Sequence, residues 1–247
     1  MALTFNELEN VVPLVLRAGN VPTIVGEAGV GKSALVAKIA DNMAARLFTT
    51  VVSLSEKGDL AIPIPPLTDK AYVTTKAYGD LADVKYGYTH TLIEIIKAAE
   101  QTPHQAVIWF LDEFNRGSQA VQSELMNLVL QRDINGLKLP ANVYLILAEN
   151  PDTSMADFKM STYGVVAGDA AIKDRTTRLV LATDVTNWLA WAAGISGTRQ
   201  RPYIHPQIQR YITENPDELF PYDRDDDLNP TPRAWQRVSD HLYELGA

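Results

Sequence analysis

Gly26-Glu27-Ala28-Gly29-Val30-Gly31-Lys32-Ser33 is the stretch that decides the fold of this 247-residue chain. It fits the phosphate-binding pattern G-x-x-x-x-G-K-S/T at every fixed position. Such a loop gathers backbone N–H groups at a helix N-terminus, where the helix dipole also favours an anion. We therefore expect these eight residues to cradle the phosphates of a nucleotide. Lys32 should reach the β- and γ-phosphates, and the Ser33 hydroxyl should bind Mg²⁺.

The sequence on either side of this loop supplies the structure that the motif requires. Residues 21–25 form a short apolar run typical of a buried strand, and residues 34–40 have the pattern of a helix. A helix over residues 3–18, capped by Thr4 or Asn6, precedes them, and a second strand is expected at 47–54. Alternating strands and helices predict a parallel sheet. The alternative is a glycine-rich turn that binds no ligand, and it does not explain why a strand precedes the loop and a helix follows it.

Two carboxylates end the next apolar run. Residues 107–111 are apolar throughout, as in a strand buried on both faces of a parallel sheet, and Asp112 and Glu113 follow directly. In nucleotide hydrolases with this loop the first such acid holds Mg²⁺, so that role falls to Asp112. Glu113 can then orient and deprotonate the attacking water. The alternative is that the two acids only cap a helix.

Another buried strand, residues 142–148, ends in a polar tip at Glu149-Asn150. The carboxyl ends of parallel strands meet at one edge of the sheet, where ligands bind. We therefore expect Asn150 to lie beside Asp112 and Glu113 and to help position the water.

Composition and charge describe an ordinary globular chain. Hydrophobic residues make up 46% and charged residues 21% of the sequence, and the longest apolar runs are too short to span a bilayer. The chain has no cysteine and no basic-then-apolar N-terminal segment, so we expect a cytoplasmic protein that makes no membrane contact. The net charge of −8 and the pI near 5.0 argue against a broad basic face for duplex DNA.

Two segments interrupt the α/β pattern. In the insertion at about 55–89, prolines break the periodicity and tyrosines alternate with lysines. This insertion is either a solvated surface excursion or a functional loop that grips an extended polypeptide or stacks on single-stranded nucleic acid. Helices are expected at 92–99 and 118–130. Asn135-Gly136 then predicts a hairpin within about 131–140.

After residue 180 no further strand is expected. Helices are predicted at 185–193 and 204–213, and Thr231-Pro232 supplies the cap and first residue of a last helix. Four apolar residues of that helix are expected to face inward: Trp235, Val238, Leu242 and Leu245. An acidic run at 223–227 is more simply solvated than metal-binding. The sequence thus predicts an α/β core at 1–183 and a helical unit at 184–247.

Together these motifs resemble those of an AAA+ ATPase. The run Asp112-Glu113-Phe114-Asn115-Arg116, the insertion and the hairpin are similar to the MoxR branch, and the runs 190–192 and 231–235 to its small stand-alone bacterial and phage members. The resemblance implies a parallel-sheet P-loop NTPase core with a small helical lid. It also implies ATP and Mg²⁺ as cofactors, and a ring of identical subunits, usually a hexamer, that share the ATP sites.

The resemblance also assigns roles to single residues. Asn150 corresponds to sensor 1 and Arg233 to sensor 2, and Glu149 stands where the family commonly has a small or hydroxyl residue. The arginine finger, which reaches a neighbour's γ-phosphate, falls in the segment 169–175 and so at Arg175. Because Thr176 replaces the usual aromatic residue, Arg178 is a rival candidate. The alternative for each arginine is a surface salt bridge.

Three functions remain open from the sequence. The first is an ATP-driven machine that remodels a protein client, together with a partner carrying a von Willebrand factor A domain, as is common for MoxR-like ATPases. The second is a motor on DNA or RNA, for which the lysines and tyrosines of the insertion would line a pore. The third is a slow, nucleotide-gated scaffold. Glu113→Gln should preserve ATP binding and remove turnover, and a scaffold alone should keep its activity in that variant.

Overall fold

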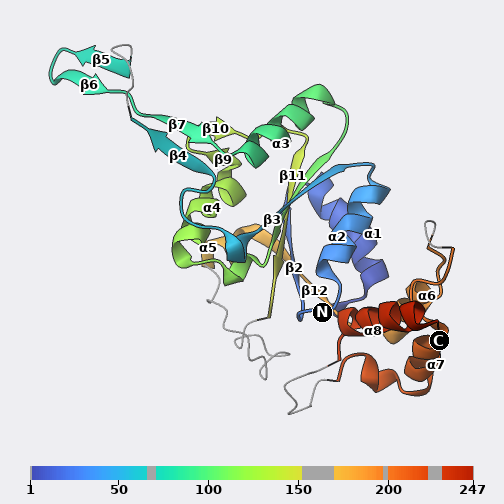
Figure 1. The fold of residues 1–247 in the computed structure, drawn as a ribbon. Coiled ribbons are helices and arrows are strands. Elements are labelled where there is room, and N and C mark those ends of the chain that lie inside the picture. Colours follow the sequence, from blue (N-terminus) through green and yellow to red (C-terminus); the bar gives the residue numbers. More distant parts are fainter. Residues whose placement is uncertain (1, 66–70, 152–169, 197–199, 222–229, 247) are drawn as a thin grey trace.

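The computed structural model of the chain describes residues 2–65, 71–151, 170–196, 200–221 and 230–246. Its centre is a six-stranded sheet in which all neighbours are parallel, in the order β1-β12-β2-β11-β8-β3 (Figure 1). The strands are β1 (Ala2–Leu3), β2 (Val21–Val25), β3 (Arg46–Val51), β8 (Val107–Asp112), β11 (Val143–Glu149) and β12 (Thr176–Leu181). The predicted parallel α/β core is confirmed.

Helices cover both faces of this sheet. They are α1 (Phe5–Arg17) and α2 (Lys32–Asn42) on one face, and α3 (His90–Gln101), α4 (Gln119–Gln131) and α5 (Ala170–Arg175) on the other (Figure 1). Side chains of β8 alternate between the two buried clusters, with Ile108 and Phe110 on the first face and Trp109 and Leu111 on the second. Burial on both faces explains why this strand is apolar throughout.

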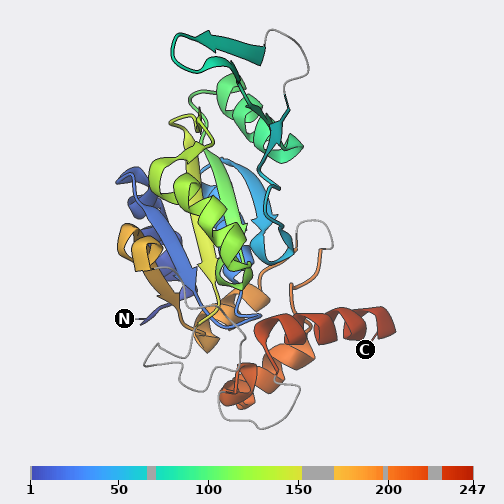
Figure 2. The ribbon, with the colours of Figure 1, turned by 90° about the vertical axis from the view of Figure 1, so that its left-hand side faces the viewer.

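The segment between β3 and α3 carries four strands that the sequence did not predict. β4 (Ala61–Ile64) pairs antiparallel with β7 (Lys85–Tyr88), and β5 (Tyr72–Thr75) pairs antiparallel with β6 (Gly79–Ala82). We call the described part of this segment, residues 61–65 and 71–88, the arm. Figures 1 and 2 show the arm projecting away from the sheet.

A small hairpin lies at the base of the arm. It consists of β9 (Asp133–Ile134) and β10 (Leu137–Lys138), which pair antiparallel on either side of Asn135-Gly136. Tyr88 is the last residue of the arm and lies at its base, where its hydroxyl donates a hydrogen bond of 3.3 Å to the Asn135 carbonyl. The arm and the hairpin are therefore in contact.

Helices follow the last strand. They are α6 (Val185–Ala192), α7 (Pro206–Glu214) and α8 (Pro232–Leu245), and they share a buried cluster of their own. As predicted, Thr231 caps α8, accepting a hydrogen bond of 3.1 Å from the Ala234 N–H at its hydroxyl. Two predicted features lie outside the described residues. They are the acidic run 223–227 and residue 169, the first residue of the segment expected to carry the arginine finger.

The inward face of α8 differs from the prediction. Trp235 and Leu242 pack against the cluster, but Val238 is 44% and Leu245 79% exposed. A polar residue, Ser239, is fully buried instead. Its hydroxyl accepts a hydrogen bond of 2.8 Å from the backbone N–H of His205, which is itself buried. A buried N–H without a hydrogen-bond acceptor destabilises the fold. The need for an acceptor therefore favours serine at position 239, although the apolar pattern of the helix predicts no buried polar residue there.

The second predicted strand is shorter than expected. β3 ends at Val51, and residues 52–54 form a 3₁₀ turn, η1 (Val52–Leu54), whose Val52 is fully buried. At the amino end of the chain, the cap of α1 is Thr4, whose side chain and that of Glu7 each accept a hydrogen bond from the other's backbone N–H. None of the helices in the described ranges is long and apolar enough to cross a membrane.

Candidate active site

The phosphate-binding loop connects β2 to α2 at the carboxyl edge of the sheet. Lys32 begins α2, and its side chain is folded back over the loop and buried. The Lys32 Nζ donates to the carbonyls of Gly26 (2.6 Å) and Glu27 (3.1 Å) and to Oδ1 of Asn150 (2.8 Å). Burial lowers the pKa of Lys32 to about 8, and the neighbouring carboxylates Asp112, Glu27 and Glu113 only partly oppose that shift.

The predicted magnesium ligands lie together at this edge. The Ser33 hydroxyl donates a hydrogen bond of 2.8 Å to Oδ2 of Asp112, and the other carboxylate oxygen accepts from the Glu113 N–H at 2.9 Å. Hydroxyl and carboxylate oxygens are the donors that Mg²⁺ prefers in proteins. Ser33 and Asp112 therefore fit a Mg²⁺ ion, which would neutralise charge on the phosphates when bound.

Glu113 is held in a special backbone conformation. Its φ of 53° lies in the left-handed region, directly after β8. One carboxylate oxygen accepts a hydrogen bond from the Ser53 hydroxyl, and the other is 3.1 Å from Nη1 of Arg116. Both partners occupy the carboxylate that the sequence assigned to the attacking water.

Asn150 lies at the tip of β11 and is 3% exposed. Its side chain contacts Lys32, as described above, and its backbone is held by Asn115 on both sides. The Asn115 Nδ2 donates to the Asn150 carbonyl at 2.7 Å, and the Asn150 N–H donates to Asn115 Oδ1 at 3.1 Å. The loop, the acid pair and the strand tip therefore lie together at the carboxyl edge of the sheet, where the sequence predicted them from the shared direction of the strands.

The two candidate finger arginines lie in different surroundings. Arg175 is exposed at the end of α5. Arg178 lies inside β12, and its Nη2 is 3.2 Å from Oε2 of Glu149, whose side chain is only 4% exposed. The structure thus brings Arg178 to the strand tip of its own subunit and leaves Arg175 at the surface.

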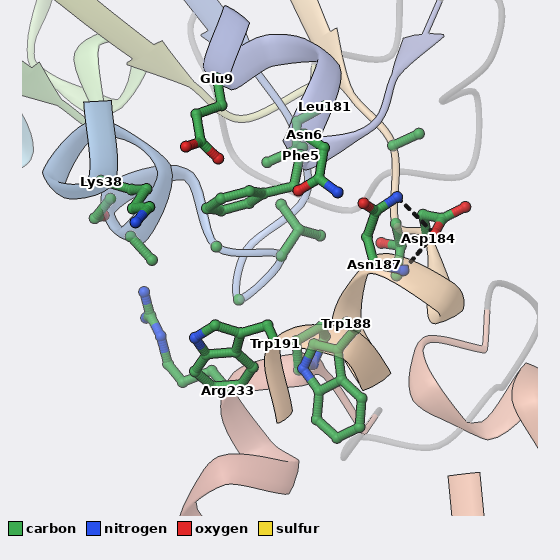
Figure 3. A pocket seen from close by; sticks show the side chains of 18 of the residues that line it. Phe5, Asn6, Glu9, Lys38, Leu181, Asp184, Asn187, Trp188, Trp191 and Arg233 are labelled. Carbon is green, nitrogen blue, oxygen red and sulfur yellow. Dashed lines mark hydrogen bonds between the residues drawn. The ribbon is translucent and has the colours of Figure 1, made fainter. Parts of the chain in front are cut away.

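A cavity of about 560 Å³ opens beside the loop (Figure 3). Phe5 of α1 lies on one side of it, and Trp188 and Trp191 of α6 lie on the other. Arg233 of α8 points toward the side of the cavity on which Lys38 lies. This volume is within the range of small-molecule sites, and the cavity can accept the base and sugar of a nucleotide whose phosphates lie on the loop.

The C-terminal helices touch the loop directly. The Arg233 N–H donates a hydrogen bond of 3.3 Å to the Gly29 carbonyl. Gly29 has a φ of +83°, and a Cβ there would lie 2.7 Å from the Thr231 hydroxyl oxygen. Glycine is therefore required at this position both by the backbone conformation and by the close approach of α8.

A protein-family comparison identifies the domain. The model of the AAA domain, dynein-related subfamily, matches residues 23–167, which are 145 of the 247 residues. The chain belongs to this family. As a member of this family the chain binds ATP with Mg²⁺ and hydrolyses it.

Solved structures agree on the fold. A mutant RuvB of Thermotoga maritima superposes with a TM-score of 0.53 at 15% identity, covering 98% of this chain and 63% of that one. NtrX of Brucella abortus gives a TM-score of 0.52 at 12% identity, covering 99% of this chain and 51% of that one. This AAA domain thus spans about half to two thirds of these relatives. Among curated proteins no match was found.

Sequence reasoning missed two residues of the site. Ser53 follows β3, whose carboxyl end lies at the same edge as those of β8 and β11, but residues 47–54 were interpreted as strand throughout. A polar residue just past a strand end was the available signal. Asn115 stands within the motif run, yet the spacing alone does not indicate that its amide would bind the strand tip.

Proposed function

We propose that this AAA domain is a subunit of an ATP-driven ring that remodels a protein client, in the manner of the MoxR-like ATPases it resembles. The ring is proposed to be a hexamer with ATP between subunits, and a protein with a von Willebrand factor A domain is the proposed partner. The observation that carries the choice of client is the surface of the arm.

The arm exposes a concentration of apolar side chains. Of the seventeen large hydrophobic residues exposed in the described part of the chain, eight lie in the arm. They are Ile62, Ile64, Tyr72, Val73, Tyr78, Leu81, Val84 and Tyr86. Exposed apolar surface gathered in one place is typical of protein–protein interaction sites.

The charge of the arm favours the same client. Its described residues contain two lysines, Lys76 and Lys85, and two aspartates, Asp80 and Asp83, and so have no net charge. Binding to nucleic acid depends on neutralising phosphates with an excess of cations. A neutral arm in a chain of net charge −8 fits a polypeptide better than DNA or RNA.

The two arginines support a shared ATP site. Arg178 already pairs with Glu149 of its own subunit, whereas Arg175 is exposed at the end of α5. We therefore assign the finger to Arg175. A cation supplied from the next subunit stabilises the anionic transition state and makes hydrolysis depend on assembly.

The test is site-specific crosslinking in a ring locked with ATP. Glu113→Gln should bind ATP without hydrolysing it, because the carboxylate that activates water is gone. A photo-crosslinking residue is placed at Tyr72 of the arm or, as a control, at Tyr211 of α7, since these side chains are 50% and 42% exposed. We expect crosslinks to discrete proteins of the native lysate at Tyr72 and none at Tyr211.

Two outcomes would contradict the proposal. Crosslinks that disappear on nuclease treatment would replace the protein client with nucleic acid. If the arm crosslinks only to other subunits, and Glu113→Gln keeps the biological activity of the protein without ATP turnover, the scaffold function would be favoured.

A further inference from the structure

The tip of β11 is paired with a neighbouring strand on one side only, and Asn115 holds the backbone of the next residue, Asn150. Register pairing of β11 with β8 ends at Leu147, and pairing with β2 ends at Glu149. The Glu149 carbonyl accepts a hydrogen bond of 3.2 Å from Gly26, the first residue of the phosphate-binding loop. The next residue, Asn150, contacts the loop lysine. Glu149 therefore joins the loop to the tip.

The side chain of Glu149 reaches across the neighbouring strand β2 to Arg178 on β12. Strand β2 lies between β11 and β12, and the register aligns Glu149 with Val25 and Arg178 with Thr23. The ion pair between Glu149 and Arg178 thus crosses over β2 on one face of the sheet, at 3.2 Å. With side-chain exposures of 4% and 23%, the pair is shielded from solvent more than ordinary surface pairs are.

We infer that Arg178 is a positioning residue: through Glu149 it fixes the strand tip so that Asn150 is correctly placed at the reacting phosphate. This inference rests on the proposed function, in which Arg175 and not Arg178 is the finger. A displacement of about 1 Å at a reacting group can reduce turnover about 100-fold, so an ion pair that locks the tip has direct kinetic consequences.

The inference requires turnover and nucleotide affinity to respond differently. In Arg178→Met, ATP affinity should stay within about threefold of wild type because the loop is intact, whereas kcat should fall about tenfold or more. This variant removes the Arg178 partner of a buried carboxylate and can fold poorly. The matched control is Arg210→Met, which removes the exposed pair of Arg210 with Glu214 on α7 and should change neither quantity.

A second variant separates positioning from folding. In Glu149→Leu/Arg178→Met the pair becomes apolar, and replacing a buried pair in this way commonly preserves stability. Its Tm should lie within about 3 °C of wild type, while kcat should remain reduced about tenfold or more, since the directional lock on the tip is lost. Wild-type kcat in this double variant would overturn the inference.

Subunit mixing separates the inference from the proposed function. Lys32→Ala subunits are inactive but carry both arginines, so they can supply a finger to a neighbour. Mixed with Arg175→Ala, they should restore activity; mixed with Arg178→Met, they should not, because Arg178 acts within its own subunit. Recovery with Arg178→Met would make Arg178 the finger and overturn the inference. If mixing with Lys32→Ala subunits restores no ATPase activity to Arg175→Ala, the proposal of a shared ATP site is contradicted. The role of Arg178 would then still be tested by comparing kcat with ATP affinity in Arg178→Met.

Discussion

Lys32 is the residue whose charge should respond to pH within an ordinary assay range. Burial lowers its pKa to about 8. Phosphates favour the protonated lysine, so above pH 8 binding must be accompanied by proton uptake at Lys32. We expect ADP affinity to be level below pH 8 and to fall up to about tenfold per pH unit above it, where the free lysine is neutral.

Calorimetry in two buffers with different ionisation enthalpies measures this proton uptake. It should approach about one proton per site at pH 9 and be near zero at pH 7. Arginine stays protonated throughout this range, so Lys32→Arg should bind more weakly but lose the pH dependence. Equal uptake in wild type and Lys32→Arg would place the proton on another group.

Ser53 is the residue that restrains the Glu113 carboxylate, which we propose activates the attacking water. Its hydroxyl hydrogen-bonds Glu113, which is also paired with Arg116 and held at a left-handed φ. Removing one such hydrogen bond should free Glu113 to reach the water, and Ser53→Ala should raise the basal ATPase rate about threefold to tenfold. The control is Ser55→Ala, because the Ser55 hydroxyl donates to the Val51 carbonyl and not to a carboxylate of the site. A lower rate in Ser53→Ala would mean that Ser53 holds Glu113 in its working position.

At the scale of the element, the arm should be separable from the ATP site. The Cα atoms of Ile62 and Gly87 are register partners, so residues 63–86 can be replaced by Asn-Gly to close a short hairpin. Among the arm residues only Ala61 and Tyr88 belong to or pack against the core, and both are retained. We expect the Tm to change by less than about 4 °C, nucleotide affinity to be unchanged, and client remodelling to be lost.

The variant is checked by thermal unfolding, ADP titration and a client assay side by side. A control that keeps the arm but substitutes Tyr78, which is 80% exposed, should retain full stability. A large loss of nucleotide affinity in the shortened chain would show that the arm supports the site, and would contradict their separation.

The elements that the sequence predicted well are those with one or both faces buried in the core. The strand, loop and helix around Gly26 to Ala40 follow from apolar runs and a motif with strict geometry. The strands of the arm did not follow, because most of their residues are exposed on both faces and the prolines interrupt any alternation. β4 pairs with β7 across the rest of the arm, which a local pattern does not record, whereas β5 and β6 pair across a short turn.

The candidate site was predictable only where strand order decides the neighbours. Asp112, Glu113 and Asn150 were expected at one edge because parallel strands end together. Ion pairs that cross the sheet have no such rule, and the pairing of Arg178 with Glu149 was therefore missed. Ser239 was missed for a similar reason, since the buried N–H that it satisfies is 34 residues away in the sequence.

At the scale of the whole molecule, the α/β sheet and the C-terminal helices meet at the phosphate-binding loop. We propose the same division as from the sequence, in which residues 1–183 form the core and residues 184–247 form the lid. Gly29 is one point of contact, since its carbonyl accepts the Arg233 N–H and the Thr231 side chain fills the space that a Cβ would occupy. The same glycine therefore has to fit both the phosphates and the cap of α8, which links lid position to nucleotide binding.

Gly29→Ala should force the lid away from the loop, because the new Cβ would lie 2.7 Å from the Thr231 hydroxyl oxygen and 2.9 Å from its Cβ. We expect ADP affinity to fall about tenfold or more, as the cavity between loop and α8 widens. Gly19→Ala is the matched control for backbone strain, since Gly19 has a similar φ of +79° and no atom within 4 Å of the new Cβ; it should lose stability without losing affinity. Thr231→Gly removes the clashing atoms at little cost to the helix cap, so Gly29→Ala/Thr231→Gly should recover most of the affinity. If the double variant binds no better than Gly29→Ala, the added methyl acts on the phosphates directly and the lid is not the cause.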